Sequence, residues 1–145
     1  MNLNLGLAFQ VIENEDFRNL LNFVSESNVD FKLPNRRSIR DYATSLQKEV
    51  DAKVKRQMSK ATSISLTTDC WTSTRQKMGF LGITAHFMNS KLVMKTACIC
   101  FKRLVGSHTG HRIAELIHDV LEAFDITKKV NYITTDNGVN IVSAV

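Results

Sequence analysis

The sequence predicts an incomplete α/β domain over residues 61–145, preceded by a small helical region over residues 1–60. At Ala61 the apolar spacing changes from the helical period to the period of two that is typical of strands. Two β-rich runs, SLTTD at 65–69 and YITTD at 132–136, end on the same Thr-Thr-Asp triplet, and a helical pattern lies between them. The resulting order, β-β-β-α-β followed by the stub of a helix, is typical of a mixed α/β sheet.

The helical region contains two predicted helices. In the segment 13–27, Asn14 is the expected N-cap and the two acids that follow it favour the start of an amphipathic helix. Pro34 then forces a turn, and Ser38 is the expected cap of a second helix that runs to about residue 60. Its apolar stripe, which we expect to pack rather than to stack on bases, consists of Ile39, Tyr42, Ala43, Leu46, Val50 and Val54.

The α/β part has three predicted strands, a helix, a fourth strand and a helix start. Asn89 and Ser90 form a tight-turn pair between the second and third strands, and Thr109 is the expected cap of the helix. The segments are 62–69, 79–88, 92–101, 108–126, 129–136 and 137–145. Because a crossover through a helix is right-handed, the first and fourth strands can lie side by side and parallel.

The net charge of +5 is concentrated in residues 35–60, where eight basic residues face three acidic ones. Such a stretch fits a polyanion such as nucleic acid, and it equally fits a solvated helix face. The candidate nucleic-acid-binding residues are Arg36, Arg37, Arg40, Lys53, Lys55 and Arg56. Three cysteines, no secretory signal and no apolar run that could cross a membrane indicate an intracellular protein with free thiols.

Asp69 and Asp136 are the candidate catalytic and metal-binding residues. Each closes a strand at its carboxyl end, where open α/β sheets gather ligands, and parallel neighbours would bring the two together. Two close carboxylates repel unless a divalent cation lies between them, and Mg²⁺ commonly uses one or two carboxylates together with substrate phosphates. The plainer interpretation of each acid is a turn or a helix cap. A regular pleat also would not obviously point both side chains the same way.

Two further sites have competing interpretations. Cys98 and Cys100, expected on one strand face, together with His108 and His111 give C-x-C followed by H-x-x-H, which could hold Zn²⁺ although the spacing matches no common finger. Trp71 either packs over a domain edge, which we favour, or stacks on a base.

Four segments resemble successive motifs of the hAT superfamily of DNA transposases and the zinc-finger BED-type host proteins derived from them. They are SISLTTDCWTS, GFLGITAHFM, HTGHRIAELIHDVL and KVNYITTDNGVNIV, and the preceding helical segments are similar as well. The resemblance implies an RNase H-like fold with a three-carboxylate, Mg²⁺- or Mn²⁺-dependent centre. Asp69 and Asp136 would take the first two acidic positions. The third, a glutamate further downstream, has no counterpart before Val145, and neither a BED zinc finger nor the dimerisation segment of complete relatives is expected here.

Two functions therefore remain open, both with a nuclear location. One is a fragment of a hAT-type transposase, with the N-terminal part of an incomplete RNase H-like core. The other is a non-catalytic, domesticated nuclear factor that binds DNA or protein, in which the two acids are relics.

Overall fold

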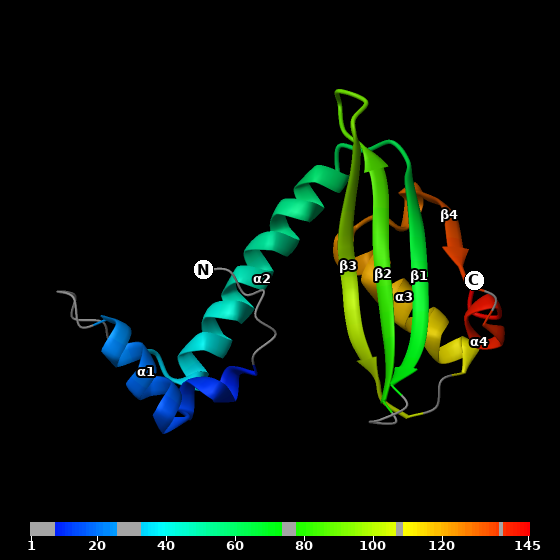
Figure 1. The fold of residues 1–145 in the computed structure, drawn as a ribbon. Coiled ribbons are helices and arrows are strands. Elements are labelled where there is room, and N and C mark those ends of the chain that lie inside the picture. The colour runs from blue at the N-terminus through cyan, green and yellow to red at the C-terminus, as the bar shows by residue number, and fades with distance from the viewer. Residues whose placement is uncertain (1–7, 26–32, 74–77, 107–108, 137) are drawn as a thin grey trace. The chain divides into compact units, whose positions relative to one another are not determined.

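The computed structural model describes residues 8–25, 33–73, 78–106, 109–136 and 138–145 (Figure 1). It confirms the α/β class, with the strands and the crossover helix in the predicted order. The elements are the 3-10 helix η1 (Phe9–Glu13), α1 (Glu15–Ser25), α2 (Arg36–Met58), β1 (Ile64–Ser73), β2 (Met78–Met88), β3 (Met94–Leu104), α3 (Gly110–Phe124), the 3-10 helix η2 (Thr127–Lys129), β4 (Val130–Thr135) and α4 (Val139–Val142).

The chain divides into two compact units, Met1–Val50 and Asp51–Val145, so α2 contributes to both. The domain division predicted at residue 60 stays a prediction. Within the described ranges, no helix is long and apolar enough to cross a membrane.

The first unit is helical and exposes much of its apolar surface. Asn14 caps α1 as predicted, because its Oδ1 accepts a hydrogen bond from the Phe17 amide at 2.9 Å. The predicted cap of α2 was wrong: Asn35 caps it, and its Oδ1 accepts from the Ser38 amide at 2.8 Å. Tyr42 is 69% exposed, so the expectation that it packs was also wrong.

The second unit is built on a four-stranded sheet in the order β3-β2-β1-β4. β1 pairs antiparallel with β2 and parallel with β4, which confirms the predicted neighbourhood of the first and fourth strands. β2 and β3 form the predicted antiparallel hairpin. Their connection is longer than the two-residue turn predicted, since β2 ends at Met88 and β3 begins at Met94.

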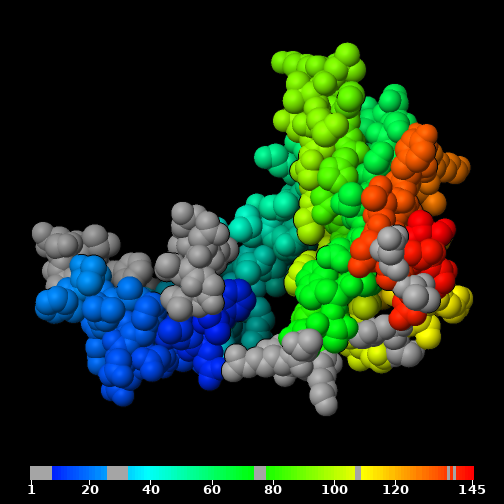
Figure 2. All heavy atoms as spheres, turned by 45° about the vertical axis from the view of Figure 1, so that its right-hand side comes forward, coloured from blue at the N-terminus to red at the C-terminus, as the bar shows by residue number. Residues whose placement is uncertain are grey.

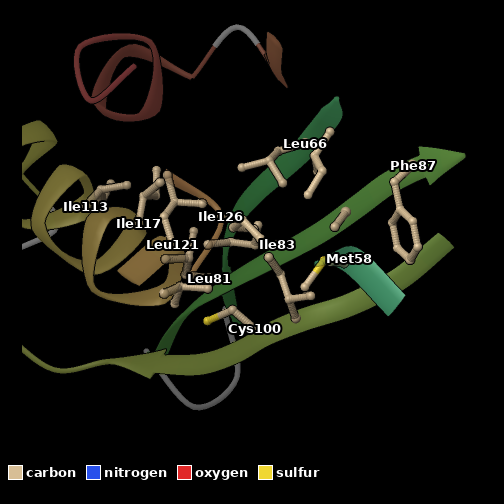
Figure 3. Packing of buried hydrophobic residues seen from close by; sticks show 14 of the residues in the cluster. Met58, Leu66, Leu81, Ile83, Phe87, Cys100, Ile113, Ile117, Leu121 and Ile126 are labelled. Atoms are coloured by element: carbon tan, nitrogen blue, oxygen red, sulfur yellow. The ribbon is translucent and has the colours of Figure 1, made fainter. Parts of the chain in front are cut away.

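Alternation along the strands buries one face of the sheet against α3. Leu66 of β1 and Leu81 and Ile83 of β2 are fully buried, and Ile113 and Ile117 of α3 point at them (Figure 3). Thr109 caps α3 as predicted, with its hydroxyl accepting from the backbone of the first turn. This packing places the first turn of α3 close to the carboxyl end of β1.

Within the second unit, the end of α2 is held by one apolar contact and three hydrogen bonds. Met58 is fully buried in the core cluster (Figure 3). Lys129 Nζ donates to the Met58 and Ser59 carbonyls at the end of α2, and Lys55 Nζ donates to the Ala123 carbonyl near the end of α3 at 2.9 Å. Both lysines therefore satisfy carbonyl groups that a helix end leaves without intrahelical partners.

Candidate functional site

The register between β1 and β4 brings the two candidate acids together. Thr67 lies opposite Thr134, and Thr68 lies opposite Thr135. Asp69 and Asp136 are the next residues along the two chains, so the same register carried one residue further sets them opposite each other. Because neighbouring strands lie about 4.8 Å apart, both carboxylates occur at one edge of the sheet, at the carboxyl ends of adjacent parallel strands.

A bulge in β4 explains how the two acids can lie on the same face of the sheet although the alternation of a regular strand would not place them so. Ile64 pairs with Val130, but Ser65 pairs with Tyr132, so Asn131 is the extra residue. Asn131 is held there by its side-chain amide, which donates to Ser63 Oγ at 2.7 Å. Since one extra residue moves all later side chains to the other face, Thr134 comes to share the exposed face of Thr67.

Both carboxylates lie near the thiol of Cys70. Burial raises the pKa of this thiol, and the negative charges of Asp69 and Asp136 raise it further. Both aspartates are themselves exposed.

The two acids differ in how far the protein already uses them. Asp136 Oδ1 accepts a hydrogen bond from the Gly138 amide at 3.2 Å, just before α4 begins. The turn interpretation of this residue is therefore also realised, and one of its oxygens is partly committed. The Asp69 side chain is exposed and makes no hydrogen bond or ion pair with any described residue.

A shallow pocket of about 190 Å³ opens beside these acids. Asp136 lines it and Asp69 does not. Its volume is below the several hundred Å³ of typical small-molecule sites, and it suits a hydrated ion or one nucleotide group better. The lining residues are Cys70, Trp71, Thr72, Leu104, Ile113, Asp136, Gly138, Asn140 and Ile141.

The donor set fits a hard divalent cation in part. Carboxylate oxygens are the ligands that Mg²⁺ and Mn²⁺ accept, and Mg²⁺ is often held by only two of them, with water and substrate phosphate completing the shell. Within the described segments, no group of three or more His, Cys, Asp or Glu side chains is placed to hold a metal ion. Among the described residues, this site therefore offers two carboxylates.

Trp71 packs within the sheet face instead of standing alone. Its ring centroid is 5.7 Å from that of Phe80 and 5.6 Å from that of Phe101, so one aromatic row crosses three strands. Gly82 makes room for it, since a Cβ there would meet the Trp71 ring at 3.3 Å. Trp71 remains 39% exposed. The packing role was predicted, but the aromatic partners were not. The alternation of side chains along β1 could have indicated that Trp71 lies on the face of the sheet opposite the core.

The possible zinc site does not assemble. A bulge at Ile99 pairs Cys98 with Thr84 and Cys100 with Ile83, which sets the two thiols on opposite faces and corrects the expectation of one shared face. Cys98 is exposed and Cys100 is buried. His111 is 87% exposed and lies 3.4 Å from Glu115. His108 lies outside the described residues.

The candidate nucleic-acid-binding residues divide evenly between the two units. Arg36, Arg37 and Arg40 belong to the first, and Arg36 pairs with Glu13 at 3.7 Å. Lys53, Lys55 and Arg56 belong to the second, and Lys55 is engaged at the end of α3. Their role in binding stays a prediction.

Comparison with known proteins places this chain in a family. Residues 67–145, more than half of the chain, match the ZBED1 RNase-like domain. A protein named transcriptional regulator tpeD, from Talaromyces stipitatus, is 29% identical over 134 residues, which are 92% of this chain and 16% of that protein. A Zea mays protein named AC transposase is 26% identical over 130 residues, 89% of this chain and 16% of that protein.

The chain thus spans about a sixth of the length of these curated relatives. The match agrees with the sheet order β3-β2-β1-β4 and confirms the predicted partial RNase H-like fold. The chain therefore belongs to the ZBED1 RNase-like domain family and is a transposase-derived protein of the hAT superfamily.

Proposed function

We propose that this chain supplies two carboxylate ligands, Asp69 and Asp136, to a Mg²⁺- or Mn²⁺-dependent centre that cleaves and joins DNA strands. The observation that supports the proposal is the β1–β4 register, in which the last paired residues, Thr68 and Thr135, immediately precede the two acids. The named activity of the Zea mays relatives supports DNA as the substrate. A nuclear location follows from that substrate.

Each residue has a defined part in this centre. Asp69, which is exposed, would hold the cation from β1, while Asp136 would hold it through the oxygen that the Gly138 amide does not engage. A bound divalent cation would neutralise charge that develops on a phosphate oxygen. Both acids act as ligands in this scheme, and neither serves as a general base.

The second candidate function is a non-catalytic nuclear factor that binds DNA or protein. The similarity to a protein named as a transcriptional regulator favours it, at an identity slightly above that of the transposases. Within the described residues, no group of three or more His, Cys, Asp or Glu side chains is placed to hold a metal ion, which supports the same alternative. A non-catalytic factor carries out no chemistry, so it does not need a third carboxylate ligand.

The first test measures the metal and then the reaction. Mn²⁺ binding to the chain should be followed by electron paramagnetic resonance for the wild type, Asp69→Asn and Asp136→Asn. Asp119→Asn, an exposed acid on α3, is the matched control because it removes the same charge from another surface. Binding should fall in both site variants and stay unchanged in the control.

Nicking of supercoiled DNA in Mn²⁺, by the longest chain that contains this segment, then separates the two functions. Loss of product in Asp69→Asn supports the catalytic proposal. Equal Mn²⁺ binding by all four proteins, or equal nicking by wild type and Asp69→Asn, would exclude it and leave the non-catalytic factor.

A further inference from the structure

The tip of the β2–β3 hairpin exposes an apolar group that the fold does not use. β1 begins at Ile64, which pairs with Phe87, so the hairpin continues past the first residue of its neighbour β1. Figure 2 shows this yellow-green tip extending beyond the adjoining strands. Four apolar side chains stand there at half exposure or more: Met88 at 51%, Leu92 at 80%, Val93 at 50% and Met94 at 65%.

The tip is held in one shape by Asn89. Its Oδ1 accepts from the Lys91 and Val93 amides at 2.9 and 3.0 Å, and its backbone exchanges hydrogen bonds with Leu92 and Val93. Leu92 is locked at φ 57°, a left-handed conformation that is unusual for a bulky side chain. The tip therefore turns a large apolar side chain to solvent from a backbone conformation that a residue of its size rarely adopts.

The charge around the tip has one sign. Residues 78–104 carry Lys91, Lys95, Lys102 and Arg103 and no acidic residue. Two of these cations, Lys91 and Lys95, flank the apolar group, and both are exposed. A partner with closely spaced negative charge and an apolar surface behind it is complementary to this arrangement.

We propose that the hairpin tip, residues 88–95, contacts duplex DNA, with Lys91 and Lys95 on phosphates and the apolar side chains toward the base edges of the major groove. The major groove admits a two-stranded β-ribbon, and thymine methyl groups give it apolar surface. The choice of DNA over another polyanion rests on the proposed function. A protein with an acidic surface and an anionic membrane are the competing partners of the test below.

The position of the tip makes it a contact distinct from the acid pair. Asp69 pairs with Gly82 on β2, and the strand from Gly82 to Met88 covers about 20 Å. That length corresponds to about six base pairs of B-form DNA. DNA that lies along β2 would therefore meet the tip well away from a phosphate at Asp69.

The test measures binding of a labelled duplex by fluorescence anisotropy across a salt series. Each phosphate contact contributes about 0.9 to the slope of log affinity against log salt. Lys91→Gln with Lys95→Gln should reduce the slope by about 1.8, since two contacts are lost. The control, Lys128→Gln, removes a charge from an exposed position outside both the hairpin and the basic stretch 35–60 and should leave the slope near wild type.

The apolar part has its own variant. Leu92→Ser with Val93→Ser should weaken binding at every salt concentration and leave the slope unchanged, because no charge is removed. Thermal melting of each variant checks that the fold persists. Asp69→Asn should retain the hairpin effects even if it loses Mn²⁺, so a failed metal centre and a failed hairpin contact give different results.

Three outcomes would overturn the hairpin contact. The tip variants could bind DNA like the wild type, or the charge control could lose as much slope as the tip pair. Alternatively, tip-dependent binding could occur on vesicles of anionic phospholipid, or to a polyglutamate peptide, while DNA binding stays unchanged.

Discussion

Replacing Thr68 by valine should raise the free energy of unfolding, which is the reverse of most core substitutions. Thr68 is 4% exposed, and its Oγ1 finds no hydrogen-bond partner among the described residues. A hydroxyl buried without a partner costs about 1–3 kcal/mol in mutational data. Valine keeps the β-branched shape that suits a strand, so the gain from removing the hydroxyl should survive at about 1–2 kcal/mol.

The neighbouring threonine is the matched control. Thr67 lies on the opposite, exposed face of β1, and its Oγ1 is 3.1 Å from His86 Nε2. Thr67→Val makes the same chemical change but removes a hydrogen bond, so it should lower stability by about 0.5–1.5 kcal/mol. Two adjacent and identical substitutions are thus expected to have opposite signs.

Urea unfolding followed by circular dichroism measures both effects. A change in midpoint at constant slope reports a change in stability. If Thr68→Val lowers the midpoint as Thr67→Val does, the Thr68 hydroxyl has a partner in solution and the reasoning from its isolation is wrong.

Two further predictions concern the surroundings of the acids. Gly110→Ala should destabilise the second unit by about 1–2 kcal/mol, since a Cβ would clash with Ser143 Oγ and would lie 3.1 Å from the Asn140 carbonyl oxygen, and overpacking outweighs the helix propensity gained. Ser143→Gly should remove part of that cost in a double-mutant cycle, and an equal cost in both backgrounds would contradict the clash with Ser143. Asp136→Asn should lower the pKa of Cys70 toward its ordinary value, so the half-maximal rate of alkylation by iodoacetamide should move to lower pH; an unchanged profile would mean that the two groups are not close.

Most of the element order was predictable because it depends on hydrophobic period. The three strands, the crossover helix and the fourth strand each carry a clear apolar spacing, and the Asn14 and Thr109 caps are local chemistry that a few residues specify. The cap of α2 was misplaced because Asn35 and Ser38 are both good capping residues three positions apart, and sequence alone does not choose between them.

Two features that the sequence did not predict depend on single inserted residues. The bulges at Asn131 and Ile99 each reverse which face the following side chains occupy, yet neither changes the apolar composition of its strand. The first resolves the doubt about the orientation of the two acids, and the second separates Cys98 from Cys100. The aromatic row was missed because it depends on register across three strands, which no one strand encodes.

The contacts that hold the end of α2 within the second unit have a practical consequence for shortened versions of this protein. A polypeptide started at Ala61, where the strand pattern begins, would lack Met58 and leave a methionine-sized hole in the sheet layer. It would also remove both acceptors of Lys129 and the Lys55 ammonium that donates to the Ala123 carbonyl. A polypeptide meant to contain the second unit alone should accordingly begin no later than Asp51, so that it includes the last turns of α2.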